Sequence, residues 1–295
     1  MRPEEWHSRG ALRHHGDYRL FVIDEGTAAQ ETLLLIHGFP TASWDWHKIW
    51  PTLRQDYRVV AMDMLGFGFS DKPTTHRYSI HDQADRVEHV VRDLGLERFH
   101  VLAHDYGDTV AQELLARQNA GTGAGQWLSA CFLNGGLFPE THRALITQKL
   151  LLSPLGPLVN RLSGYRSFAR AMGRVFGADT QPDSRELNDF WSLIEHNEGR
   201  HVFHNLITYM RDRRQHRERW VGAIQHSKVP VALINGSADP VSGAHMVARF
   251  RELELPLDYL AELPRIGHYP HTEAARAVVE HYLAFLETIS PRAET

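Results

Sequence analysis

Residues 103–107, with the sequence AHDYG, have the pattern of a nucleophile elbow in which an aspartate replaces the usual serine. The apolar segment 98–103 predicts a buried strand before Asp105, and the segment 109–115 predicts an amphipathic helix after it. Gly107 permits a sharp turn, and the N-terminal end of the following helix favours an ionised carboxylate. The motif alone also fits an ordinary surface loop with two acids. As an elbow, it predicts that Asp105 attacks carbon and becomes an ester.

Two further residues follow in the chain order nucleophile, acid, histidine that such elbows use. Asp239 comes just after a strand predicted over residues 229–236, and His268 lies in a loop after a strand predicted at about residues 257–263. An acid at this place holds the imidazole in one tautomer, and the imidazole then deprotonates water. We therefore expect Asp105, Asp239 and His268 to form a catalytic triad.

A loop after an early buried strand is the candidate oxyanion hole. The apolar run of residues 33–36 leads into His37-Gly38-Phe39-Pro40. The N–H of Phe39 is expected to act with the N–H of Tyr106 on a developing negative charge. Because four such elements occur in the right order, chance is a poor explanation for them.

The composition is that of a globular enzyme, and its charge pattern does not indicate nucleic-acid binding. The 295 residues are 42% hydrophobic and carry a formal net charge of −4, and the basic segment 211–219 fits a solvated helix face. Cys131 is the single cysteine, so no intramolecular disulfide can form, which is compatible with a cytoplasmic location. The first ten residues do not resemble a signal peptide, and no run approaches the ~20 apolar residues of a spanning helix, so no membrane anchor is expected.

Alternating strands and helices predict an α/β fold with a mostly parallel sheet covered by helices on both faces. Residues 11–24 suggest an antiparallel strand pair, followed by a helix that carries Trp46 and Trp50. A strand over residues 57–62 and a helix at about residues 80–94 continue the alternation.

The pattern changes after residue 136, where helical segments follow one another without a convincing strand. We interpret residues 137–223 as a helical lid inserted between an N-terminal core segment, 1–136, and a C-terminal core segment, 224–295. Such a lid is expected over the carboxyl ends of the strands, where α/β sheets hold their ligands.

Motifs for cofactors and metals are lacking. Residues 121–126 lack the last glycine of a dinucleotide-binding motif and follow a helix, and no HExxH or Cys/His cluster occurs despite 20 histidines. No cofactor and no metal are therefore expected. The absence of GxSxG argues against a serine esterase.

Several strings resemble a known superfamily. HGFP from His37, DMLGFGFSDKP from Asp63, HDYGD from His104 and GHYP from Gly267 resemble the Asp-nucleophile branch of the α/β-hydrolase superfamily, which includes epoxide hydrolases and haloalkane dehalogenases. More narrowly, HGFPTASWDWHKIW, NGGLFPETHR and RERWVGA resemble the family of the mesoderm-specific transcript protein, over roughly residues 33–286. This resemblance implies an α/β-hydrolase fold and the triad named above, and it does not supply a substrate.

The leaving group depends on hydrogen-bond donors. Haloalkane dehalogenases hold the halide with a Trp and an Asn, and the matching positions here are Tyr106 and Phe39, which do not make a strong halide cradle. Fluoroacetate dehalogenases keep an Arg where Tyr106 stands. Epoxide hydrolases protonate the opening oxygen with two lid tyrosines. Tyr209 is our first candidate donor, although the family position falls on Met210, and Tyr165 is the second.

The sequence therefore predicts a hydrolase that adds water to a small or medium apolar epoxide through an aspartyl ester. In this scheme His268 serves only the second step, in which it activates water. A haloalkane dehalogenase, an ester or lactone hydrolase that uses Asp105 as a base, and a non-catalytic ligand-binding protein on the same fold are the alternatives. The expected partners are the small apolar substrate and water, without nucleic acid, and the oligomeric state stays open.

Overall fold

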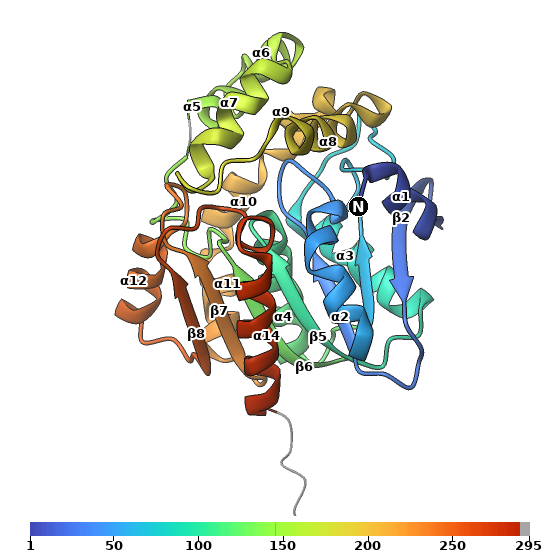
Figure 1. Cartoon of the computed structure of the whole chain (residues 1–295), viewed down its shortest axis with the longest axis vertical. Helices are drawn as coiled ribbons and strands as arrows, with labels where there is room; N and C mark the ends of the chain where they lie inside the picture. The colour runs from blue at the N-terminus through green and yellow to red at the C-terminus, as the bar shows by residue number, and fades with distance from the viewer. Residues whose placement is uncertain (145, 290–295) are drawn as a thin grey trace, which may run out of the picture.

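A computed structural model describes residues 1–144 and 146–289. In this described part, eight strands form one sheet in the order β1-β2-β4-β3-β5-β6-β7-β8 (Figure 1). The strands are β1 (Ala11–His15), β2 (Tyr18–Glu25), β3 (Thr32–Ile36), β4 (Arg58–Met62), β5 (Arg98–His104), β6 (Gln126–Leu133), β7 (Val231–Gly236) and β8 (Tyr259–Leu263). The pairs β1–β2 and β2–β4 are antiparallel and the others are parallel, as the alternation of strands and helices predicts.

The central strands are apolar along their whole length because helices cover both faces of the sheet. In β3 every residue is buried, with Leu34 and Ile36 in the hydrophobic core on one face and Leu33 and Leu35 in the core on the other. The first face is covered by α3 (Ile80–Asp93), α4 (Tyr106–Ala120), α11 (Arg217–Gln225) and α12 (Ala244–Glu252). The second face is covered by α1 (Pro3–Arg9), α2 (Trp50–Asp56) and α14 (Ala275–Ile289).

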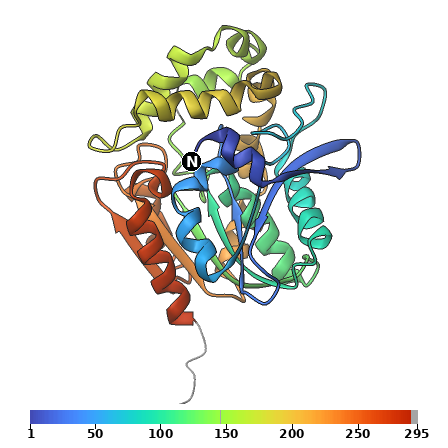
Figure 2. The same ribbon diagram turned by 45° about the vertical axis from the view of Figure 1, so that its right-hand side comes forward.

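Between β6 and β7 the chain makes a helical insertion, which lies over the carboxyl ends of the parallel strands (Figures 1 and 2). Its helices are α5 (Ile146–Leu151), α6 (Gly156–Leu162), α7 (Tyr165–Val175), α8 (Ser184–Glu195), the 3-10 helix η2 (His196–Val202), α9 (Phe203–Leu206), α10 (Tyr209–Gln215) and α11. The last helix, α11, packs on α4 of the core. Residue 145 of the expected lid and residues 290–295 of the expected C-terminal core segment lie outside the described residues.

Two local features differ from the sequence expectation. The segment with Trp46 and Trp50 forms a 3-10 helix, η1 (Ser43–Lys48), followed by α2, because Pro51 favours the start of a new helix over the continuation of the old one. The short helix α13 (Pro270–Glu273) follows the loop after β8. None of the described helices combines the length and apolar character that a membrane-spanning helix needs.

Candidate active site

Asp105 occupies a strained turn between β5 and α4. Its backbone has φ 50° and ψ −105°, a region that non-glycine residues rarely adopt, and its side chain is almost fully buried. A Cβ atom on Gly107 would lie 2.3 Å from the carbonyl oxygen of Ile36 and 2.5 Å from that of His37. The turn therefore requires glycine at this position, and it brings the carboxylate to the carboxyl end of the sheet.

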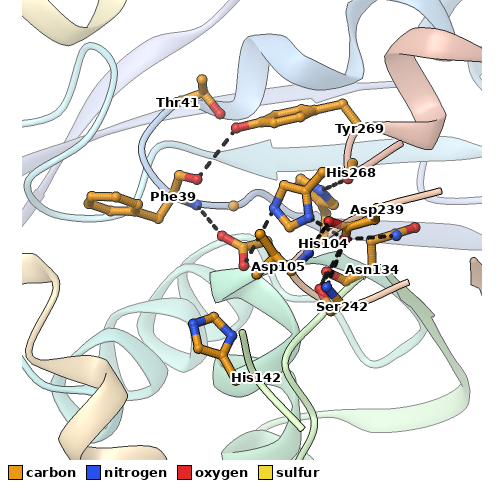
Figure 3. Close-up of polar contacts among 12 residues, drawn as sticks. Phe39, Thr41, His104, Asp105, Asn134, His142, Asp239, Ser242, His268 and Tyr269 are labelled. Atoms are coloured by element: carbon orange, nitrogen blue, oxygen red, sulfur yellow. Dashed lines mark hydrogen bonds and ion pairs between the residues drawn. The ribbon is translucent and has the colours of Figure 1, made fainter. Parts of the chain in front are cut away.

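The three residues predicted as a triad lie together (Figure 3). Nδ1 of His268 is 2.7 Å from Oδ2 of Asp239, and Nε2 of His268 is 3.7 Å from Oδ1 of Asp105. The side chains come from the loops after β8, β7 and β5. This geometry lets Asp239 orient the imidazole while Nε2 faces the carboxylate of Asp105.

Asp239 is held by several donors. Its Oδ1 accepts a hydrogen bond of 2.7 Å from the N–H of Val241, and its Oδ2 accepts bonds from the N–H of Ser242 at 3.1 Å and from Nδ2 of Asn134 at 3.0 Å. Sequence reasoning missed Asn134 and Ser242. The signal for Asn134 was its position directly after β6, where an amide can reach the loop of the neighbouring strand.

Neighbouring charges shift the pKa values of His268 and Asp239. Burial alone would lower the pKa of His268, but the charge and hydrogen bond of Asp239 and the charge of Asp105 outweigh it and raise that pKa to about 9. Burial alone would raise the pKa of Asp239, but the charge and hydrogen bond of His268 lower it. The raised pKa of His268 therefore favours its imidazolium form in the resting protein.

The candidate oxyanion hole faces the carboxylate of Asp105 itself. The N–H of Phe39 donates a hydrogen bond of 3.0 Å to Oδ2 of Asp105 (Figure 3). Tyr106 is the first residue of α4, so its N–H has no acceptor within the helix. The two expected donors thus belong to the loop and the helix end that flank the same carboxyl group.

A cavity of about 140 Å³, partly open to solvent, lies above Asp105 and His268. Most of the side chains around it are apolar, which suits an apolar ligand. The core contributes Phe39, Pro40, Asp105, Val241, His268 and Tyr269, and the insertion contributes Gln148, Leu151, Ser163, Gly164, Ser167, Phe168, Ala171, Met172, Val175, Trp191, Arg200 and Phe203.

Neither expected proton donor lines this cavity. Tyr209 is 1% exposed, and its ring packs against Tyr106, Phe39 and the guanidinium of Arg213. Tyr165 is half-buried on α7, and its ring lies 6.3 Å from that of Trp191. The aromatic packing around Phe39 places Tyr209 behind the cavity wall, which a one-dimensional motif does not reveal.

Arg200 and Tyr269 are polar residues that line the cavity and that sequence reasoning missed. Arg200 reaches it from η2, where Nη1 donates to the carbonyl oxygen of Ser163 at 3.1 Å and Nε lies 3.3 Å from Glu195. Tyr269 follows His268, and its hydroxyl donates to the carbonyl oxygen of Phe39 at 3.4 Å. No sequence motif indicates that Arg200 belongs to the site. Tyr269 could have been predicted because it directly follows His268.

A cation from the insertion contacts the elbow backbone. Nε of Arg213 donates to Oγ1 of Thr109 at 2.7 Å, and its Nη2 donates to the carbonyl oxygen of Asp105 at 3.2 Å. Arg213 is 2% exposed. It therefore ties α10 to the start of α4 and helps to position the turn.

Among the described residues, Asp45, His104 and His271 are the group whose ligand atoms lie close enough to hold a metal ion, within 4.8 Å of one another. All three are fully buried behind the elbow, and Nε2 of His104 lies 2.8 Å from the carbonyl oxygen of His268. Burial raises the pKa of Asp45 well above its usual range and lowers that of His104 to about 3. Both shifts favour the neutral forms, which cost less to bury than the charged forms.

The sheet order and the loops after β5, β7 and β8 are those of an α/β hydrolase. A sequence profile described as alpha/beta hydrolase fold matches residues 31–120. The mesoderm-specific transcript homolog protein of Bos taurus is 42% identical over 293 residues, which cover 96% of this chain and 87% of the relative. The putative hydrolase LipZ of Mycobacterium tuberculosis is 38% identical, with 96% and 97% covered.

A solved structure shares the fold. The crystal structure of a haloalkane dehalogenase DbeA loop variant from Bradyrhizobium elkanii superposes with a TM-score of 0.80 at 20% identity, and the match covers 95% of this chain and 96% of that one. The chain therefore belongs to the α/β-hydrolase superfamily and, within it, to the family of the mesoderm-specific transcript proteins.

Proposed function

We propose that this α/β hydrolase acts through a covalent ester at Asp105 on a small or medium apolar electrophile, with an epoxide as the first candidate substrate and residues 137–223 as the lid. The observation that carries the proposal is the position of the Asp105 carboxylate. It lies at the floor of an apolar cavity, between the N–H of Phe39 and the imidazole of His268. A carboxylate there contacts both groups that a later hydrolysis needs.

In the first step, Oδ1 of Asp105 attacks a carbon of the epoxide, and the bond from that carbon to the ring oxygen breaks. An in-line displacement places the leaving oxygen opposite Asp105, on the lid side of the cavity. The cation in that wall is Arg200, which stabilises the developing alkoxide. Arg200 replaces the lid tyrosines in this role, since Tyr165 and Tyr209 do not reach the cavity.

Ester formation changes the charge around His268. The ester has lost the negative charge of Asp105, which helped to raise the pKa of His268, so that pKa falls. His268 then releases its proton through cavity water, and the alkoxide takes one up. In this scheme the histidine contributes to the proton balance of the first step as well, which departs from the sequence expectation that it serves the second step only.

In the second step, neutral His268 takes a proton from water, and the resulting hydroxide attacks Cγ of Asp105. The oxyanion forms at Oδ2, where the N–H groups of Phe39 and Tyr106 stabilise it. Collapse breaks the bond between Cγ and Oδ1, which leaves with the substrate carbon, and the proton of the new hydroxyl on Cγ passes to this leaving oxygen, so a diol is released. Asp105 is again a carboxylate and His268 an imidazolium, so the cycle closes.

A haloalkane is the second candidate substrate. A halide leaves without a proton, so the absence of both lid tyrosines from the cavity lining does not oppose this reaction. Arg200 would then face the leaving halide. The same ester at Asp105 and the same hydrolysis by His268 follow.

A substrate panel tests the proposal. Purified wild-type protein and the Asp105→Ala variant are incubated with apolar epoxides, 1-haloalkanes and aryl esters, while diol, halide and phenol release are measured. We expect diol formation by the wild type and none by the variant. Halide release in place of diol would select the second candidate. Ester cleavage alone would indicate that Asp105 acts as a base, and ligand-induced thermal stabilisation without turnover would identify a binding protein.

A further inference from the structure

The outer end of the insertion exposes an unusual number of large apolar side chains. Among the described residues, seven large hydrophobic side chains are exposed, and five of them lie on α5, α6 and the turn between them. We call these five the apolar tip: Ile146, Leu150, Leu155, Leu158 and Leu162, with exposures from 43% to 76%. In both ribbon views, α5 and α6 lie at the end of the molecule that is farthest from the sheet (Figures 1 and 2).

The spacing of the tip residues gathers them on one side of each helix. Ile146 and Leu150 are four positions apart on α5, and Leu158 and Leu162 are four positions apart on α6, with Leu155 at its N-cap three positions before Leu158. The two helices also contact each other. A contiguous exposed apolar patch of this kind marks an interaction surface, since single exposed leucines are common but clusters are not.

The chain around the tip is strongly basic. Residues 141–178 contain six Arg or Lys residues and no Asp or Glu, although the whole chain has a formal net charge of −4. The six are exposed: Arg143, Lys149, Arg161, Arg166, Arg170 and Arg174. Within the part of the chain that the structure describes, none of their side chains forms an ion pair.

We propose that the apolar tip inserts into an anionic lipid surface, with the surrounding basic side chains against the headgroups. Apolar residues flanked by cations are the pattern of helices that lie in a membrane interface. A second copy of the chain would bring two basic segments together, which like charges oppose. A polyanion without an apolar phase would leave the leucines uncovered, so anionic lipid matches both the charge and the apolar side chains.

Helices α5 and α7 connect the apolar tip and the basic side chains around it with the cavity. Leu151 of α5 and Ser167 of α7 line the cavity, whereas Leu150 and Arg166 next to them are exposed. Insertion of the tip would place this cavity wall beside the lipid phase, from which an apolar substrate can enter. This last consequence rests on the proposed function, and the insertion itself does not.

Vesicle binding tests the proposal with the full chain. The protein is sedimented with vesicles of phosphatidylcholine and with vesicles of an equal mixture of phosphatidylcholine and phosphatidylglycerol. We expect binding to the mixed vesicles that weakens with salt, and at least about tenfold weaker binding to phosphatidylcholine alone. The triple variant Leu155→Asn, Leu158→Asn, Leu162→Asn should lose at least about tenfold in affinity for the mixed vesicles.

Matched variants separate charge from apolar insertion. Arg161→Gln, Arg166→Gln and Arg170→Gln together should also weaken binding to the mixed vesicles. Leu12→Asn, and Arg77→Gln, Arg98→Gln and Arg185→Gln together, should not, because these exposed residues lie outside the tip segment. Thermal melting confirms that each variant is folded.

Three outcomes would overturn the proposal: no binding to either vesicle, binding that the tip variants leave unchanged, or equal binding to both compositions. Sedimentation velocity adds a fourth, since a wild-type dimer that the leucine variant abolishes, without vesicle binding, would assign the tip to a second copy. These experiments measure vesicle binding, so a negative result would reject the membrane proposal and would not bear on the chemistry proposed at Asp105. Likewise, a protein that binds vesicles but turns over no substrate would reject only the proposed function.

Discussion

The backbone N–H of Phe39 donates a hydrogen bond of 3.0 Å to Oδ2 of Asp105. In a serine hydrolase the corresponding N–H donates its hydrogen bond to an oxygen of the substrate when the tetrahedral intermediate forms. Here it already holds an oxygen of the side chain that we propose as nucleophile, and it leaves Oδ1 beside His268. The arrangement fits a tetrahedral intermediate that forms on Cγ of Asp105 rather than on a substrate carbonyl.

Removal of the carboxylate should abolish turnover and leave the fold in place. We expect Asp105→Ala to lower the turnover rate by at least about 10⁴-fold, the scale on which lost nucleophiles act. The side chain contributes its charge to the cavity rather than to the hydrophobic cores, so thermal melting should still show one cooperative transition. Turnover near the wild-type rate in a folded variant would rule out the nucleophile role.

The pKa of His268 should respond to its two carboxylate neighbours. Asp105→Asn removes one negative charge, so the pKa should fall from about 9 toward the ordinary value of 6.5. In the wild type, the raised pKa stabilises the fold at pH values below about 6.5, and this contribution is lost as pH rises through about 9. In the variant, the pH range over which this contribution to stability is lost should be narrower, because the pKa of the folded state lies closer to 6.5. NMR titration of the imidazole measures the shift, and an unchanged pKa would show that Asp105 does not act on the ring.

The elbow glycine should be essential for stability. In Gly107→Ala the new methyl group would lie 2.3 Å from the carbonyl oxygen of Ile36, so β3 and α4 must separate. We expect a loss of at least ~3 kcal/mol in the free energy of unfolding. The matched control is Gly222→Ala in α11, which meets nothing within 4 Å and should be neutral or stabilise by up to ~1 kcal/mol. Denaturant unfolding compares the two, and similar values would contradict the packing at the elbow.

The sequence predicted those parts of the site that follow a strand. Asp105, Asp239 and His268 each come shortly after a predicted buried strand, and parallel strands deliver such residues to one edge of the sheet. Phe39 could be placed for the same reason. Chain order and strand ends thus sufficed for these residues because the sheet itself determines their positions.

The residues of the insertion could not be placed in this way. Arg200 reaches the cavity from a 3-10 helix in which Asn197 and Glu198 have positive φ. No hydrophobic periodicity in the sequence indicates such a segment. Tyr209 sits on a helix as expected, yet Phe39 and Tyr106 enclose its ring. Which face of a short helix turns toward a cavity depends on packing between segments far apart in sequence.

The two tyrosines of the insertion should contribute little to catalysis. Because neither hydroxyl lines the cavity, we expect Tyr209→Phe and Tyr165→Phe each to change the turnover rate by less than about threefold, far from the ~10²-fold effect of a lost general acid. Arg200→Met should lower the rate of the first step by at least about tenfold, and Arg185→Met, an exposed arginine of α8, should not. A loss of about 10² in Tyr209→Phe would restore the tyrosine as the proton donor.

The most direct test separates the two half-reactions in a His268→Ala variant. Without a base to activate water, the ester at Asp105 should persist, so intact-protein mass spectrometry should show one equivalent of added substrate, and peptide mapping should place it on the segment that contains Asp105. A 1-haloalkane that the wild type consumes serves as the first probe because its leaving group needs no proton, and an epoxide serves as the second. If the folded variant binds a substrate that the wild type turns over but never carries a covalent adduct, the aspartyl-ester mechanism is wrong.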